Sequence, residues 1–251
     1  MLSNNQIKKL KSLHTKKFRT QHKQFIIEGY RLIKEALNAK IKFDGIWCSD
    51  EFANKNQELI NSLKVTNNSW EITSTKSLSQ VCDSMNNQGI VASIKLPKKK
   101  KFNSTNSSIL ILDNISDPGN MGTILRSAEW FGIRDIILSS ACVDPYNSKV
   151  IRSAMGAHFY MNQICQNNDI KKLITKLQED GIDIIGADLN GTSINKFIPP
   201  QKWALVLGSE AFGISNEVKT LLNASITIPN KGNIESLNVS IATGIILNHL
   251  T

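Results

Sequence analysis

Four short runs of Ile, Leu and Val in the second half of the chain constrain the fold more than any other feature. They begin at residues 108, 135, 181 and 202 and read SILILDN, DIILSSAC, GIDIIGADL and KWALVLGS. Nearly continuous apolar runs of this length are typical of parallel strands that are buried on both faces. Helical patterns separate them: MGTILRSAEWFG, NNDIKKLITKLQED and SNEVKTLLN. The alternation predicts an α/β domain built on a largely parallel sheet.

The first part of the chain reads as a second, smaller α/β domain. QFIIEGYRLIKEALNAK has apolar residues at helical spacing, which predicts a helix over residues 24–40. FDGIWCS and GIVASIKL read as strands, and NQELINSLK and SLSQVCDSM as helices. The segment KLPKKKKFNSTNSS lacks hydrophobic periodicity and reads as a surface linker. We therefore expect domains over residues 1–95 and 109–251, joined by a linker over residues 96–108.

The charge of the chain is distributed unevenly. Residues 1–106 carry 19 Lys and Arg against 8 Asp and Glu, whereas residues 107–251 carry 11 against 13. A basic half is the electrostatic footprint of a polyanion partner, most often a nucleic acid. A solvated lysine-rich surface explains the charge alone equally well.

Other features narrow the class of protein. No apolar run approaches the ~20 residues that span a bilayer, and MLSNNQIKKLKSLHTKK lacks the apolar core of a signal peptide. We therefore expect a soluble cytoplasmic protein without a membrane partner. The four cysteines form no C-x-x-C pair and do not cluster in sequence with histidines, so we expect reduced thiols and no metal site.

The stretch NISDPGNMGTILRSA, residues 114–128, has three interpretations: a nucleotide-phosphate loop, a plain strand-to-helix connection, or a catalytic loop that handles RNA. The spacing of its two glycines fits neither a Walker loop nor a dinucleotide fingerprint. If the following residues are helical, Ile124, Leu125, Ala128 and Phe131 form one apolar sector. Arg126 then points about 160° away from the centre of that sector.

Three loops follow apolar strands in this domain, over residues 114–122, 208–215 and 229–238. The carboxyl ends of parallel strands lie at one edge of a sheet, where ligands bind. The second loop contains Glu210 in a glycine-rich turn, and the third places Ser236 and Asn238 where a final helix begins. Each polar residue alone is explained by helix capping. Their convergence with Asn114 and Arg126 favours a functional site.

The same residues resemble the SpoU/TrmH family of RNA ribose 2′-O-methyltransferases, in the SPOUT superfamily. The matching motifs are DNISDPGNMGTILRSAEWFG, LVLGSEAFGIS and IPNKGNIESLNVSIATGI, in that order, with VIRSAMGAHF between the first two. FIIEGYRLIKEAL and SQVCDSMNNQGIVASI resemble the ribosomal-protein-like substrate-binding domain of the rRNA-modifying branch.

This resemblance implies a fold, a cofactor and an assembly. The expected fold is a small N-terminal ribosomal-protein-like α/β domain followed by a SPOUT domain, whose C-terminal segment forms a deep trefoil knot, a rare exception to unknotted chains. The expected cofactor is S-adenosyl-L-methionine, bound largely through backbone groups at Gly208, Ile228 and Leu237, with Asn238 adjacent. Members of the family are homodimers with the knots at the interface.

The resemblance also implies the catalytic residues, which are Asn114, Arg126, Glu210, Ser236 and Asn238. Arginine is a poor general base because its pKa exceeds about 12. We therefore expect Arg126 to orient the ribose 2′-hydroxyl and the adjacent phosphate and to stabilise the developing alkoxide. The other side chains would hold the guanidinium and the cofactor in position.

Three readings of the activity differ in their substrate or in their chemistry. The leading one is 2′-O-methylation of rRNA, most simply of the large subunit, and the nearest rival is the same reaction on tRNA. The N-terminal domain favours rRNA because tRNA-specific members of the family typically carry only short helical extensions. The third reading is a catalytically silent RNA-binding or ribosome-assembly factor on the same fold. A small-molecule methyltransferase would leave the basic half unexplained.

The expected RNA-binding surface lies in the basic N-terminal segment. Its members are Lys8, Lys9, Lys11, Lys16, Lys17, Arg19 and Lys23. RNA is recognised largely by shape, exposed loops and the 2′-hydroxyl, which suits a separate docking domain.

Overall fold

The computed structural model describes residues 2–66, 69–83, 87–98 and 108–251. By its internal contacts the chain forms two compact units. The first holds residues 1–98 and 146–159, and the second holds residues 99–145 and 160–251. Most of the predicted linker, and the end of the predicted helix SLSQVCDSM, lie outside the described residues. The contiguous domain limits stay a prediction.

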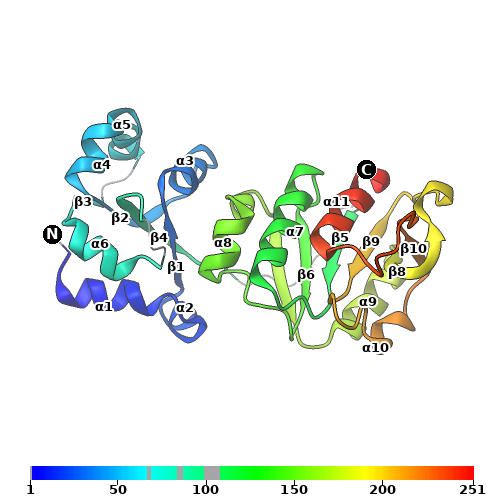
Figure 1. Cartoon of the computed structure of the whole chain (residues 1–251). Coiled ribbons are helices and arrows are strands. Elements are labelled where there is room, and N and C mark those ends of the chain that lie inside the picture. The colour runs from blue at the N-terminus through cyan, green and yellow to red at the C-terminus, as the bar shows by residue number, and fades with distance from the viewer. Residues whose placement is uncertain (1, 67–68, 84–86, 99–107) are drawn as a thin grey trace. The chain divides into compact units, whose positions relative to one another are not determined.

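A four-stranded mixed sheet forms the centre of the first unit (Figure 1). Its strands, in spatial order, are β1 (Gln24–Glu28), β4 (Ile90–Lys95), β2 (Phe43–Cys48) and β3 (Trp70–Ile72). β4 is antiparallel to both β1 and β2, and β3 is parallel to β2. The register pairs Ile94 with Phe25 on one side and with Phe43 on the other. These three side chains therefore form one apolar row on a single face of the sheet.

Residues 24–40 do not form one helix, so this sequence prediction was wrong. Gln24–Glu28 form β1, and helix α3 (Tyr30–Asn38) begins only after Gly29. Gly29 has a φ of +90°, a conformation that favours glycine. The apolar spacing misled because buried residues of the strand happen to continue the helical pattern of α3. Cross-strand pairing of the run QFIIE with β4 decides the outcome.

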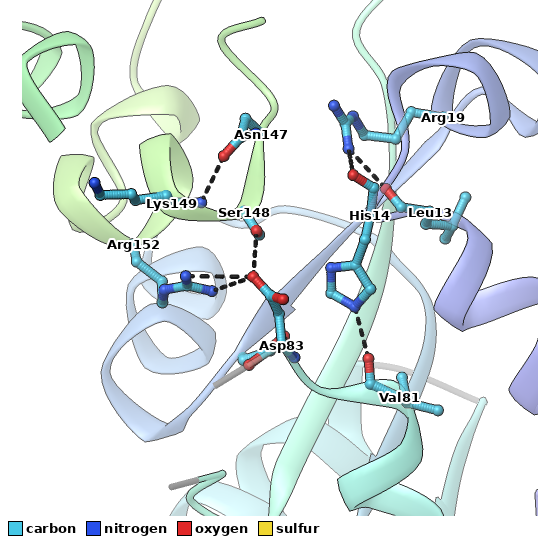
Figure 2. Close-up of polar contacts among 10 residues, drawn as sticks. Leu13, His14, Arg19, Val81, Asp83, Asn147, Ser148, Lys149 and Arg152 are labelled. Atoms are coloured by element: carbon cyan, nitrogen blue, oxygen red, sulfur yellow. Dashed lines mark hydrogen bonds and ion pairs between the residues drawn. The ribbon is translucent and has the colours of Figure 1, made fainter. Parts of the chain in front are cut away.

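Besides α3, residues 1–98 form five described helices: α1 (Asn4–Ser12), α2 (Lys16–His22), α4 (Asp50–Lys55), α5 (Gln57–Thr66) and α6 (Thr75–Val81). Arg19 on α2 is only 3% exposed. Its Nη1 donates hydrogen bonds to the carbonyl oxygens of Leu13 and His14, both at 2.8 Å, where α1 ends (Figure 2). A cation at the C-terminal end of a helix is stabilising. Arg19 is therefore a structural residue, and its inclusion in the RNA-binding surface was wrong.

Residues 146–159 contribute helix α8 (Ser148–Ala154) to the first unit. Ile151 is 2% exposed and belongs to the same apolar core as Phe25 and Ile27. The ring of Tyr146 packs against that of Phe25, with centroids 5.1 Å apart. An internal segment of the chain thus completes the core of the N-terminal unit.

Polar contacts attach the same segment to the loop that follows α6 (Figure 2). Ser148 Oγ donates a hydrogen bond of 2.8 Å to Asp83 Oδ2. Both Nη atoms of Arg152 lie 3.4 Å from that same oxygen. The hydrogen bond from Ser148, with smaller contributions from His14 and Arg152, lowers the pKa of Asp83.

A six-stranded parallel sheet forms the centre of the second unit (Figure 1). Its spatial order is β10 (Ala224–Thr227), β8 (Asp183–Ser193), β9 (Trp203–Leu207), β5 (Ser108–Leu112), β6 (Asp135–Ser139) and β7 (Gln163–Asn167). Every neighbouring pair is parallel. The four apolar runs form β5, β6, β8 and β9, which confirms the prediction of an α/β fold on a parallel sheet. Sequence did not reveal β7 and β10, which are short and carry polar residues.

Helices α7 (Pro118–Trp130), α9 (Ile170–Glu179), α10 (Asn216–Lys219) and α11 (Val239–Leu250) belong to the second unit. On α7, Ile124, Leu125 and Ala128 are fully buried, whereas Arg126 is exposed. This confirms the orientation predicted for Arg126. Helix α11 packs against α7.

Burial keeps the thiols of Cys48 and Cys82 in the protonated form. Burial raises the pKa of Cys48 to about 11 and that of Cys82 to about 12, so both thiols are protonated at neutral pH. None of the cysteines in the described part of the chain forms a disulfide. Across the described ranges, no three His, Cys, Asp or Glu side chains are grouped as a metal site would require. None of the described helices has the length and apolar character to cross a membrane.

Candidate active site

The carboxyl ends of β5 and β9 are tied together by Asp113, the residue that follows β5. Its backbone N–H donates a hydrogen bond of 2.8 Å to the carbonyl oxygen of Leu207. Its Oδ2 accepts a hydrogen bond of 2.8 Å from the backbone N–H of Ser215, where α10 begins. Asp113 is only 2% exposed, and it holds both ends of the loop over residues 208–215, one through its backbone N–H and the other through its carboxylate. β5 lies between β9 and β6 in the sheet. The chain runs from β5 to β6 on one side and returns to β9 on the other, so the strand order reverses at β5. In parallel sheets, ligands bind beyond the carboxyl ends of the strands at such a position.

The loop after β9 is a tight turn that requires glycine at its base. Ser209 and Gly213 exchange two backbone hydrogen bonds, of 3.1 and 2.8 Å. A Cβ atom at Gly208 would lie 2.0 Å from the carbonyl carbon of Gly213, so only glycine fits. The turn projects its tip outward: Glu210 is exposed and Phe212 is 89% exposed.

Asn120, in the first turn of α7, joins the three loops. Asp117 caps this helix by accepting a hydrogen bond of 2.8 Å from the backbone N–H of Asn120. The side-chain Nδ2 of Asn120 donates to Glu210 Oε1 on the second loop. Its Oδ1 accepts a hydrogen bond of 3.0 Å from Nδ2 of Asn238 on the third loop. Side chains separated by about 90 and 118 positions in sequence therefore meet at one point.

Asn238 is held in place by its second role as the N-cap of α11. Its Oδ1 accepts hydrogen bonds from the backbone N–H and from the hydroxyl of Ser240, at 3.0 and 2.6 Å. The capping geometry therefore aims the amide nitrogen of Asn238 at Asn120. The preceding loop is shaped by Asn230, which bonds the carbonyl of Ile234 and the N–H of Gly232.

The other predicted site residues lie on the same three segments. Arg126 is on the exposed face of α7, and within the described residues no hydrogen bond or ion pair engages its guanidinium. Ser236 and Leu237 are exposed in the loop before α11, and Ile228 is half-buried directly after β10. Arg126 and Ser236 are thus open to a ligand.

Asn114 is directed elsewhere. It adopts a left-handed backbone conformation with a φ of +60°. Its N–H donates a hydrogen bond of 2.9 Å to Ser139 Oγ, and its Oδ1 accepts one of 3.3 Å from the same hydroxyl. These contacts connect the end of β5 to the end of β6. In the described part of the chain no hydrogen bond joins Asn114 to Asn120, Glu210 or Asn238.

Sequence reasoning missed Asn120 and Asp113. Asn120 lies in a run of turn-forming residues at the expected start of a helix. The sequence therefore offered no reason to predict a contact of its side chain with the other loops. The signal that could have found it is the cap: Asp117 followed by Pro118 fixes the helix start, so Asn120 lies in the first turn beside the strand ends. Asp113 could have been found as a carboxylate at the end of a fully apolar strand.

This group of side chains has a definite chemical character. The junction offers a carboxylate and two amides, and the segments that lead to and from it carry the exposed Ser236 hydroxyl and Arg126 guanidinium. Loops 114–122 and 208–215 contain no lysine, the third loop contains only Lys231, and the Glu210 carboxylate repels phosphate groups. The arrangement therefore does not suit a nucleotide triphosphate. It suits a ligand that carries a positive charge, together with a second molecule whose oxygen approaches Arg126.

The comparisons with known proteins agree with this description. The model of the SpoU rRNA Methylase family matches residues 107–248, and that of the MRM3-like substrate binding domain matches residues 4–92. The chain belongs to the SpoU rRNA methylase family, which confirms the resemblance read from its motifs.

Individual relatives match the chain over nearly its whole length. The 23S rRNA (guanosine(2553)-2′-O)-methyltransferase RlmP of Bacillus subtilis is 32% identical over 98% of this chain and 96% of its own. A Porphyromonas gingivalis structure assigned to the TrmH family of RNA methyltransferases has a TM-score of 0.88 at 32% identity, covering 100% of this chain and 98% of that one. AviRb of Streptomyces viridochromogenes, a SpoU methyltransferase solved with AdoMet, shares the fold with a TM-score of 0.85 at 22% identity, over 99% and 97% of the chains.

Proposed function

We propose that this chain is an S-adenosylmethionine-dependent methyltransferase that methylates a ribose 2′-hydroxyl in RNA of the large ribosomal subunit. The proposal is carried by the junction at Asn120, whose side chain contacts both Glu210 and Asn238. Asn120 lies on α7, the helix that also carries Arg126. The full-length match to an rRNA 2′-O-methyltransferase supports the choice of reaction and substrate.

The loops around this junction fit S-adenosylmethionine by their chemistry. This molecule carries a flat adenine and a positively charged sulfonium, and when bound it supplies the methyl group. The carboxylate of Glu210 matches the positive charge. Leu237 is 41% exposed and offers an apolar surface to a flat ring. The backbone groups of Gly208, Ile228 and Leu237 are the proposed contacts to the adenine.

Arg126 is proposed to act on the RNA hydroxyl. A guanidinium keeps its proton at neutral pH, so it cannot remove the proton of the hydroxyl. It can donate hydrogen bonds to the 2′-oxygen and to an adjacent phosphate and so stabilise the charge that develops as the hydroxyl proton passes to solvent water. Glu210, Ser236 and Asn238 are proposed to position the two reactants. Asn114 is proposed to act indirectly, by holding the ends of β5 and β6 through Ser139.

The first unit is proposed to dock the RNA. Its exposed lysines on and next to α1 and α2 are Lys8, Lys9, Lys11, Lys16, Lys17 and Lys23. If about six phosphates are neutralised on single-stranded RNA, the logarithm of the binding constant falls with that of the salt concentration at a slope of about −4. A cytoplasmic location is proposed together with this substrate.

A homodimer is proposed as the working assembly. Helix α11 is apolar on both sides: Ile246 and Leu247 are buried, whereas Ile241 is 57% and Ile245 38% exposed. Exposed isoleucines one turn apart are typical of a helix with a partner. The trefoil knot expected for the segment that contains α11 stays a prediction.

Transfer of labelled methyl from S-adenosylmethionine to RNA tests the proposal. The RNA comes from a strain that lacks the gene, and the rRNA and tRNA fractions are separated after the reaction. We expect the labelled methyl group in rRNA. Because it blocks one 2′-hydroxyl, the neighbouring phosphodiester linkage should resist alkaline cleavage. Label in tRNA alone would retain the chemistry and overturn the substrate. No label in any fraction, intact subunits included, would favour a silent RNA-binding factor.

The variant Arg126→Ala identifies the site in the same assay. We expect the rate to fall about 1000-fold because a guanidinium that stabilises developing charge contributes of that order. Arg134→Ala is the matched control, since Arg134 is also exposed but pairs with Glu129 at 3.0 Å. Equal rates for the two variants would remove Arg126 from the mechanism.

A further inference from the structure

We propose that Phe212 holds the base of the RNA nucleotide that is methylated, by stacking its ring on an unpaired base. Phe212 is 89% exposed at the tip of the loop over residues 208–215. It is the only aromatic residue in the three loops that meet at Asn120. The inference rests on the proposed function and deepens it, because it defines the substrate at that site as a nucleotide outside a duplex.

The loop holds the backbone of Phe212 in a fixed position. The N–H of Phe212 donates a hydrogen bond of 3.2 Å to Ser209 Oγ. Ser209 and Gly213 exchange two backbone hydrogen bonds, and the close approach of the chain at Gly208 leaves no room for a larger residue there. The turn therefore presents the ring on a preformed backbone, and little ordering of the chain opposes binding of a ligand to it.

Phe212 also lies beside the junction at Asn120. Glu210, two positions earlier, accepts a hydrogen bond from Nδ2 of Asn120. Two residues of chain span at most about 7 Å, so the Cα atoms of Glu210 and Phe212 lie within that distance. Asn238 contacts the same Asn120, and the helix of Asn120 also carries Arg126. The ring is therefore attached close to the place where the methyl donor and the ribose hydroxyl are proposed to meet.

An RNA substrate brings a flat group to this edge of the sheet. The base and the 2′-hydroxyl are carried by adjacent carbon atoms of one ribose, so a hydroxyl bound at Arg126 brings its own base with it. Unpaired bases of RNA are commonly recognised by stacking on aromatic side chains. Every base has a π face, so stacking on Phe212 binds a base without selecting its identity. The ring thus fits an unpaired nucleotide, whose base is free to leave its neighbours.

The surroundings of the ring favour a base over a protein partner. Within the turn from Ser209 to Gly213, no other residue has a large apolar side chain. A stable protein interface buries about 800 Å² on each partner, far more than one ring provides. The adenine of the cofactor is proposed to lie on Leu237 in the third loop, which leaves the ring of Phe212 for the second reactant.

Steady-state methyl transfer by the full chain tests this role. The substrate is rRNA from a strain that lacks the gene, and Phe212→Leu removes the aromatic ring but keeps an apolar side chain. We expect KM for RNA to rise about 10-fold, the effect of one stacked base, while KM for S-adenosylmethionine stays unchanged. Phe212→Trp should keep the wild-type KM because the larger ring can stack in the same way.

Ile198→Ala is the matched control. Ile198 is 87% exposed in the same unit, and it lies outside the three loops. Its replacement removes a similarly exposed apolar side chain and should leave both KM values unchanged. A wild-type KM for RNA in Phe212→Leu, or a loss that Phe212→Trp does not restore, overturns the proposal.

Two other occupants of the ring predict different results for Phe212→Leu. If the ring stacked on the adenine of the cofactor, the variant would raise the dissociation constant of S-adenosylmethionine measured by titration calorimetry. If it packed against a second copy of the chain, the variant would lower the molar mass measured by light scattering. We expect both quantities to match the wild type, and a change in either overturns the proposal.

A cross-linking measurement, which does not depend on methyl transfer, locates the base directly. Oligouridylate with one central 5-iodouridine is cross-linked by light to the full chain in the presence of S-adenosylmethionine, and the modified peptides are identified by mass spectrometry. Adducts on Phe212 support the proposal, and their absence overturns it. Methyl transfer to rRNA by the same wild-type preparation is measured in parallel. A Phe212 adduct without transfer would count against the proposed reaction, and transfer without that adduct would count against the base site.

Discussion

The two sheets of this chain assemble polar residues in different ways. In the parallel sheet of the second unit, every strand ends at the same edge, so loops distant in sequence meet there and Asn120 can contact both Glu210 and Asn238. The mixed sheet of the first unit has no such common edge. There a cavity forms over a sheet face, and a segment from the middle of the chain supplies its wall. In the parallel sheet the loops alone form the site. In the mixed sheet the cavity is formed only with the added segment of residues 146–159.

The largest effect should come from the turn at the parallel edge. Gly208→Ala places a methyl group where the carbonyl carbon of Gly213 lies 2.0 Å away, so the turn must open. We expect the free energy of unfolding to fall by about 2–3 kcal/mol, as for overpacked positions, and methyl transfer to fall about 100-fold as Glu210 is displaced. Urea denaturation and the methyl-transfer assay measure the two effects. Gly232→Ala, whose Cβ would meet only Asn230 Oδ1 at an ordinary contact distance of 3.8 Å, should leave both unchanged.

The second largest effect is expected from a variant at Asn120, where the three loops meet. Asn120→Ala removes the hydrogen bond to Glu210 and the acceptor for Asn238, so the side chains are no longer held together. We expect kcat/KM to fall about 30-fold, equivalent to the loss of a hydrogen bond to a charged group. Thr123→Ala, one turn along the same helix, is the control and should behave like the wild type. A normal rate for Asn120→Ala would show that each loop keeps its position unaided.

A third prediction concerns the first unit. Arg19→Met keeps the aliphatic bulk of the buried side chain but removes two hydrogen bonds to the end of α1. We expect the unit to lose about 2 kcal/mol of unfolding free energy, because two buried carbonyl groups lose their charged donor. Thermal unfolding of the full chain measures the change. If Arg19 bound RNA instead, the variant would unfold normally and bind RNA more weakly.

A fourth prediction compares lysines of the two units. Replacing Lys8, Lys9 and Lys11 by alanine should make the salt dependence of RNA binding shallower by about 2 in logarithmic slope, since each phosphate contact contributes about 0.7. The matched triple variant replaces Lys171, Lys172 and Lys176 on α9, which are also exposed. Filter binding at several salt concentrations should give the wild-type slope for this control. Equal slopes for both triple variants would contradict RNA docking on the first unit.

The smallest change in unfolding free energy is expected from Asp83, which binds Ser148 and Arg152 of α8. The pKa of Asp83 is lowered chiefly by the hydrogen bond from Ser148, so the charged form stabilises the folded state at pH values above the ordinary carboxyl pKa of about 4. This contribution is lost as the pH falls through the lowered folded-state pKa. We expect Asp83→Asn to cost about 0.5 kcal/mol at pH 7, as for exposed ion pairs, and almost nothing at pH 2. Urea denaturation at the two pH values measures the difference.

Local sequence patterns predicted much of the secondary structure of the second unit. They predicted little of how the first unit is assembled. Continuous burial predicted β5, β6, β8 and β9, and helical spacing predicted that Arg126 is exposed, because both depend on neighbours in sequence. The strand β1 was missed because its pairing with β4 is non-local. The same holds for Asn120, whose partners lie on other loops, and for residues 146–159, whose place in the first unit depends on packing with β1. Motif order identified the family, but contacts of this kind set the geometry.

The inclusion of residues 146–159 in the first unit has a consequence for synthesis of the chain. The N-terminal unit cannot complete its core when residue 98 leaves the ribosome, because Ile151 and Tyr146 have not yet been made. At about 5–20 residues per second, the delay until residue 159 is roughly 3–12 s. During that interval the nascent unit exposes the apolar surface of its sheet, so its folding is completed only after translation of part of the methyltransferase unit.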